Sequence, residues 1–119
     1  MQGFMSHDVK NLLADLPTAL PQELVDVLHS TDDVRIERVV STGHSSPAGF
    51  WYDQPEDEWV LLLAGEAQLQ FKSEDQPRQL RAGDCLLIPA HVEHRVAWTT
   101  PAAATVWLAV FLKSPQNAS

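Results

Sequence analysis

The sequence has little of what would place it in a secreted, membrane-spanning or disulfide-stapled class. Cys85 is the only cysteine, so an internal disulfide framework is excluded. No apolar run approaches the ~20 residues that cross a bilayer as a helix, and no positively charged start leads into an apolar core as in a signal peptide. We therefore predict a cytoplasmic protein with no membrane partner.

Basic residues are also scarce. Lys and Arg number 8 against 16 Asp and Glu, which gives a formal net charge of -8. The positive charges form no stripe that could neutralise phosphates, so nucleic acid is not an expected partner. A chain of 119 residues has the length of one domain and can bury a hydrophobic core without cross-links.

The first thirty residues favour helices. Over residues 9–16 the apolar side chains recur at i, i+3, i+4 and i+7, as on one face of a helix. Pro21 suits the first turn of a second short helix over residues 21–28. We predict an N-terminal helical extension over residues 1–30.

From residue 34 onward the apolar period changes to two. The stretches 34–40, 67–72 and 105–111 alternate, and turn signals rich in Gly, Pro, Ser and Asp separate the stretches. Short strands of this kind favour a barrel or a two-sheet sandwich over βαβ units. We predict an all-β barrel over residues 31–113, followed by a flexible tail over residues 114–119.

Three predicted strands are apolar at nearly every position. They cover residues 58–64, 85–90 and 106–112. Both faces of such a strand must be covered, one by the barrel core and the other by a dimer interface or the N-terminal helices. We therefore predict a homodimer.

Two stretches carry a recognisable spacing of turn and polar residues. Glu58 is followed by six residues and Gly65, while Gly83 is followed by five residues and Pro89, with four more before His94. These stretches resemble the paired motifs of the cupin superfamily. The resemblance spans about residues 34–112 and implies an RmlC-like fold, a jelly-roll β-barrel with a site in its interior.

The first cupin motif also holds two histidines one residue apart, ahead of its glutamate. A spacing of three residues before the glutamate puts Tyr52 and Gln54 in their places, and a spacing of four puts Trp51 and Asp53 there. Neither alignment restores a histidine. Because alternate residues of a strand share a face, only one of these two pairs can point into the barrel.

Four acidic residues lie close together between the aromatic run 50–52 and the strand that follows. Glu56 and Asp57 are expected to be solvated loop acids or an electrostatic lip of the site. Glu58 begins a buried strand, where an unpaired carboxylate is costly, so we expect it to be paired or bound to a cation. In the second motif, His91 stands where the family has a glycine.

The resemblance implies a site for a divalent metal ion (Fe, Mn, Ni or Zn) and a small-molecule ligand or substrate. The implied metal ligands are Glu58 and His94, with Asp53 or Gln54 completing the set. If the protein is an enzyme, Tyr52 or His91 can move a proton. The alternative is a cupin that binds or senses a small molecule without transforming it, with or without a metal.

Overall fold

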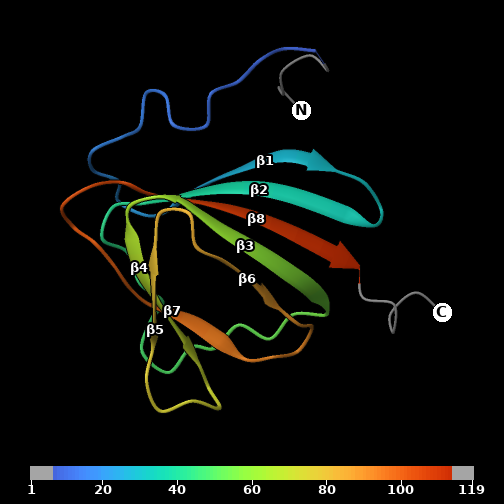
Figure 1. Ribbon diagram of the computed structural model, residues 1–119, viewed down its shortest axis with the longest axis vertical. Helices are drawn as coiled ribbons and strands as arrows, with labels where there is room; N and C mark the ends of the chain where they lie inside the picture. The colour runs from blue at the N-terminus through green and yellow to red at the C-terminus, as the bar shows by residue number, and fades with distance from the viewer. Residues whose placement is uncertain (1–6, 114–119) are drawn as a thin grey trace.

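The computed structural model describes residues 7–113 as an all-β protein of two antiparallel sheets (Figure 1). One sheet has the strand order β1-β2-β8-β3-β6, and the other has the order β5-β4-β7. This confirms the all-β prediction. The strands are β1 (Leu24–Ser30), β2 (Val34–Ser41), β3 (Glu56–Ala64), β4 (Glu66–Phe71), β5 (Arg78–Arg81), β6 (Cys85–Ile88), β7 (His94–Thr99) and β8 (Thr105–Lys113).

The predicted N-terminal helical extension is wrong for the residues that the structure describes. Residues 7–23 contain turns but no helix, and residues 24–30 form β1, which pairs with β2. A register shift between Val27 and His29 interrupts that pairing. The bulge conceals the period of two in the sequence, so the apolar spacing resembles that of a helix. Residues 1–6 and the predicted tail 114–119 lie outside the described residues.

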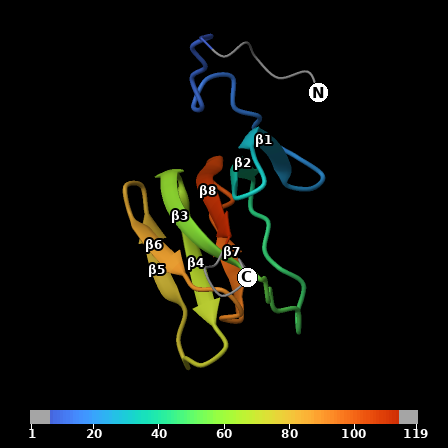
Figure 2. The same ribbon diagram turned by 90° about the vertical axis from the view of Figure 1, so that its right-hand side faces the viewer.

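The core lies between the two sheets, where the alternating strands turn their apolar sides toward one another. Leu62, Leu69 and Ile88 are buried there, and Trp107 is 6% exposed. β1 and the segment before it lie far from β5 (Figures 1 and 2). The smaller sheet therefore covers the β3 side of the larger sheet more than its β1 side.

The opposite face of the five-stranded sheet is also apolar. Trp59 and Val110 are paired on this face and half-buried. Leu87, opposite Trp59 on β6, is 53% exposed. The helices that were expected to cover this face are not present in residues 7–113, so the homodimer remains a prediction.

An extended segment before β3 runs along the free edge of β7. Ser46 N donates to Val96 O at 2.8 Å, Tyr52 N donates to His94 O at 2.7 Å, and His94 N donates back to Tyr52 O at 3.2 Å. The segment therefore acts as a short irregular strand on the edge of the smaller sheet. This pairing places residues 52–54 beside the start of β7.

Within residues 7–113, no helix is long and apolar enough to cross a membrane.

Candidate functional site

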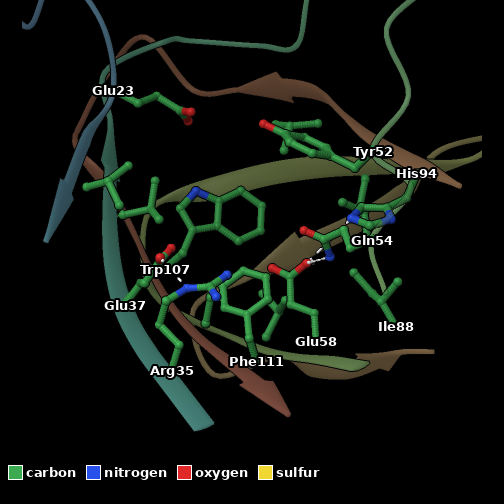
Figure 3. Close-up of a pocket in the computed structure, with 16 residues that line it drawn as sticks. Glu23, Arg35, Glu37, Tyr52, Gln54, Glu58, Ile88, His94, Trp107 and Phe111 are labelled. Carbon is green, nitrogen blue, oxygen red and sulfur yellow. Dashed lines mark hydrogen bonds and ion pairs between the residues drawn. The ribbon is translucent and has the colours of Figure 1, made fainter. Parts of the chain in front are cut away.

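A cavity of about 280 Å³ opens between the two sheets (Figure 3). Apolar side chains from both sheets form much of its wall, among them Val60, Leu69 and Val96. The polar side chains of the lining are those of Glu23, Arg35, Glu37, Tyr52, Gln54, Glu58 and His94, together with the indole N–H of Trp107. An apolar cavity with a few converging polar groups is the usual form of a small-molecule site.

Two of these polar groups, those of Gln54 and His94, converge on Glu58, the third residue of β3. Gln54 Nε2 donates to Glu58 Oε1 at 3.0 Å, and His94 Nε2 lies 3.5 Å from the same oxygen. The Glu58 side chain is only 14% exposed and that of His94 only 5%. A buried carboxylate is costly unless it is paired, and these two contacts supply that pairing.

The His94 ring is held in one orientation by the backbone. Its Nδ1 lies 2.8 Å from Val92 O, so Nδ1 carries a proton and donates. Nε2 is then directed at Glu58. Burial lowers the pKa of His94, whereas the contact with Glu58 and the bond to Val92 O raise it, and the pKa is raised on balance.

Tyr52 covers one side of His94. The two rings are stacked with centroids 5.5 Å apart, and Phe50 meets Tyr52 edge-on at 4.8 Å. Burial and then the negative charges of Glu23 and Glu58 raise the pKa of the Tyr52 hydroxyl above its ordinary value. The hydroxyl therefore keeps its proton at neutral pH.

The structure answers the question of which residues of the run 51–54 face inward. Tyr52 and Gln54 line the cavity, and Asp53 does not. The pairing of Tyr52 with His94 sets this alternation. Of the two candidates Asp53 and Gln54, only Gln54 is within reach of Glu58.

Asp53 and His91 form a separate pair outside the cavity lining. Asp53 Oδ1 lies 2.7 Å from His91 Nδ1, with side chains 50% and 63% exposed. His91 has a φ of 63°, a left-handed conformation that explains why the cupin motif has glycine there. Its N–H donates to Gln54 O at 2.7 Å. The pair therefore joins the turn before β7 to the segment that carries Gln54, and a catalytic role of His91 stays a prediction.

The expectation that Glu56 and Asp57 are solvated loop acids is wrong. Both residues belong to β3 and are half-buried. Glu56 Oε2 accepts from Arg35 Nη1 at 2.9 Å, and Asp57 Oδ1 accepts from Ala90 N at 2.8 Å. Of the acidic cluster, only Glu58 lines the cavity.

The sequence analysis did not identify Glu23, Arg35 or Glu37, which also line the cavity. Arg35 Nε donates to Glu37 Oε2 at 2.8 Å, and the guanidinium lies 4.2 Å from the centre of the Phe111 ring. The signal available was the alternation of residues 34–40, which puts Arg35 and Glu37 together on one face of the strand. Glu23 could not be found in this way, because it precedes β1.

The donor set bears on the metal that the motifs imply. Among the described residues, no three His, Cys, Asp or Glu side chains lie close enough to hold a metal ion. The set at Glu58 is one carboxylate, one imidazole nitrogen and one amide. The oxygen and nitrogen of the Gln54 amide are assigned from the hydrogen bonds around them. Rotating this amide by half a turn would turn its oxygen, which can bind a metal ion, toward the site. A mixed set of oxygen and imidazole donors fits divalent transition metals.

Comparison with known proteins agrees with this architecture. The model of the cupin domain matches residues 38–111. A solved structure from Ralstonia eutropha JMP134, named "putative mannose-6-phosphate isomerase", is 45% identical, covers 90% of this chain and 99% of its own, and superposes with a TM-score of 0.87. None of the curated proteins compared with the chain matches it.

Two further solved structures carry the family name. A cupin superfamily protein from Desulfitobacterium hafniense DCB-2 is 26% identical, with 83% of this chain and 84% of that chain covered and a TM-score of 0.69. An RmlC-like cupin from Methanocaldococcus jannaschii shares the fold at 18% identity, with 95% and 96% covered and a TM-score of 0.70. With the domain match spanning most of the two sheets, the chain belongs to the cupin family.

Proposed function

We propose that this cupin binds a divalent metal ion through Glu58, His94 and Gln54 and holds a small polar molecule in the adjoining cavity. The observation that carries the proposal is the convergence of His94 Nε2 and the Gln54 amide on one oxygen of Glu58, at 3.5 and 3.0 Å. The bond from His94 Nδ1 to Val92 O supports it, because a backbone partner on the other ring nitrogen commonly orients a metal-bound histidine.

The residues around the site would bind and orient a substrate and donate hydrogen bonds to it. When bound, the metal ion supplies Lewis-acid chemistry. Tyr52 faces the same cavity with a hydroxyl that keeps its proton, so it can donate a hydrogen bond to a substrate oxygen. The wall formed by Val60, Leu69 and Val96 excludes water from one side of the ligand.

A non-catalytic binding or sensing cupin is the second candidate, and one observation favours it. Glu58 already has two partners, Gln54 and His94. This arrangement satisfies the buried carboxylate without a metal ion. In this case the same three side chains would serve as hydrogen-bonding groups for the ligand.

The metal content of the protein, purified without chelator or nickel affinity resin, tests the proposal. We expect near one equivalent of iron, manganese, nickel or zinc by elemental mass spectrometry. His94→Ala should lose this metal while remaining folded by circular dichroism, because it removes the imidazole that contacts Glu58. A metal-free wild-type protein, even after each ion is added back, would favour the binding candidate.

Two neighbouring variants provide a matched comparison. Gln54→Ala should lower the metal affinity, since Gln54 lines the cavity, and Asp53→Asn should leave it unchanged, since Asp53 pairs with His91 outside. Removing one ligand from a small set typically costs at least tenfold in affinity, a loss similar to or larger than that for an outer-shell partner. The reverse ranking would show that Asp53 turns inward in the metal-bound protein.

A further inference from the structure

The end of the cavity opposite His94 is built by the segment that precedes β1. Leu20 N donates to Thr42 Oγ1 at 3.0 Å. His44 Nδ1 accepts from Thr42 N at 3.0 Å, so its Nε2 carries the proton and donates to Leu20 O at 3.1 Å. Ser41 Oγ donates to the Glu23 carboxylate. These bonds hold the Glu23 side chain over the cavity (Figure 3).

Trp107 forms the wall below Glu23. Its side chain is 6% exposed and lines the cavity. Figure 3 shows the indole nitrogen, on the edge of the ring, turned toward Glu23. A Trp N–H is a hydrogen-bond donor, so an oxygen of a molecule in the cavity can accept from this group.

The charge of the cavity decides which molecules it can hold. Three carboxylates line it, those of Glu23, Glu37 and Glu58, and Arg35 is the one lysine or arginine in the lining described. The Arg35 guanidinium is already bound by Glu37 and Glu56, at 2.8 and 2.9 Å. A phosphate or carboxylate near Glu23 would therefore meet a negative charge without a free cation to offset it, in a site where solvent screens weakly.

We propose that the Glu23 end of the cavity binds a small amine that carries a neighbouring oxygen, such as an amino sugar or an amino alcohol. The ammonium pairs with the Glu23 carboxylate, on the side of Trp107 where the ring edge carries its N–H. The neighbouring oxygen accepts the indole N–H. This inference rests on the ligand-binding part of the proposed function, because it names the ligand class of the same cavity.

The test uses three sugars that differ in charge: glucosamine at a pH where its amine is protonated, glucose, and glucose 6-phosphate. The indole N–H signal of Trp107 in ¹⁵N-labelled protein, assigned with Trp107→Phe, reports binding. We expect glucosamine to shift this signal with an affinity at least about tenfold above that of glucose, equivalent to ~1.4 kcal/mol. Glucose 6-phosphate should cause no shift.

Glu23→Gln should lower the glucosamine affinity about tenfold and abolish the preference over glucose, since a neutral amide keeps the shape but not the charge. Glu66→Gln is the matched control, because it removes the same charge from an exposed residue outside the cavity lining. Equal binding of glucose and glucosamine, preference for the phosphate, an unaffected Glu23→Gln variant, or no shift with glucosamine at its highest soluble concentration would each overturn the inference.

Repeating the titration with chelator-treated protein separates the two proposals. Binding of glucosamine by protein without metal supports the amine site even where the metal proposal fails. A protein that retains metal through His94 but binds the three sugars without regard to charge supports the metal proposal and overturns the amine site.

Discussion

At the residue scale, Glu58 shows how one buried carboxylate organises its surroundings. Of the acidic cluster 53–58, only Glu58 lines the cavity. Its carboxylate accepts a hydrogen bond from Gln54 and contacts His94. Asp57 points to the opposite face of β3 because successive side chains of a strand alternate, whereas Glu56 shares the face of Glu58 but pairs with Arg35. The Glu56 carboxylate accepts a hydrogen bond from Arg35, and the Asp57 carboxylate accepts one from the backbone N–H of Ala90.

The raised pKa of His94 predicts how the stability of the metal-free protein depends on pH. A histidine whose folded pKa exceeds its unfolded value stabilises the fold below the unfolded pKa, and this contribution is lost as the pH rises through the folded pKa. We expect the free energy of unfolding of the wild type, minus that of His94→Gln, to decrease as the pH rises through this window.

Urea unfolding of chelator-treated wild type and His94→Gln between mildly acidic and alkaline pH measures this difference. The subtraction removes the contributions of the other titrating groups that both proteins share. A difference that is constant, or that grows as the pH rises, would show that the charged pair of His94 and Glu58 does not stabilise the fold.

At the element scale, two glycines of the cupin motifs have different reasons to be glycine. Gly65 joins β3 to β4 with a φ of +87°, and Gly83 precedes β6 with a φ of +96°. A Cβ at Gly65 would lie 2.6 Å from Thr105 Cα, in the first residue of β8, whereas a Cβ at Gly83 would meet nothing within 4 Å. Only Gly65 is required by a close backbone approach.

This difference predicts the relative cost of two alanine substitutions. Gly83→Ala should destabilise the fold by about 1–2 kcal/mol, the cost of a side chain in the left-handed region. Gly65→Ala carries the same cost plus the clash with Thr105, so we expect a loss on the order of 4 kcal/mol. Thermal or urea unfolding of both variants measures the two losses, and equal values would contradict the close approach.

The N-terminal element shows where reading the sequence locally fails. The spacing of apolar residues in 21–28 fits a helix, yet residues 24–30 pair with β2 as an edge strand. The bulge between Val27 and His29 adds a residue to β1, which removes the regular alternation. β-Branched Val25 and Val27 favour the strand, but only the free edge of β2 makes that strand possible.

At the scale of the whole molecule, the apolar outer face of the five-stranded sheet predicts self-association. Trp59 and Val110 are half-buried there, and Leu87 and Leu112 are 53% and 36% exposed. Burying such a face against a second copy would remove this apolar surface from water. We expect a homodimer by sedimentation at micromolar concentration.

Two substitutions on opposite faces of this sheet locate the interface. Leu87→Glu places a charge on the outer face and should give a monomer, whereas Val27→Glu, on the inner face of β1, should leave the dimer intact. Val27 is a suitable control because it is 45% exposed. A monomeric wild type, or a dimer that only Val27→Glu disrupts, would contradict the predicted interface.

Much of the fold could be predicted from the sequence because it depends on local pattern. The period of two predicts strands with one buried face, and the spacing of Gly65, Gly83 and Pro89 marks the turns that lead toward His94. The strands and turns depend on backbone preferences and on side-chain alternation within single segments. That Glu58 and His94 belong to one site is instead what the resemblance to the cupin motifs implies.

Only the tertiary structure decided which side chains share the cavity. The pairing of Tyr52 with His94 turns Gln54 inward and Asp53 outward, and the bonds of residues 20–23 to residues 41–44 bring Glu23 over Trp107. These placements result from hydrogen bonds between segments distant in sequence. A local pattern records which face a residue occupies on its own strand, but the opposing residues depend on how strands pair and how the two sheets pack.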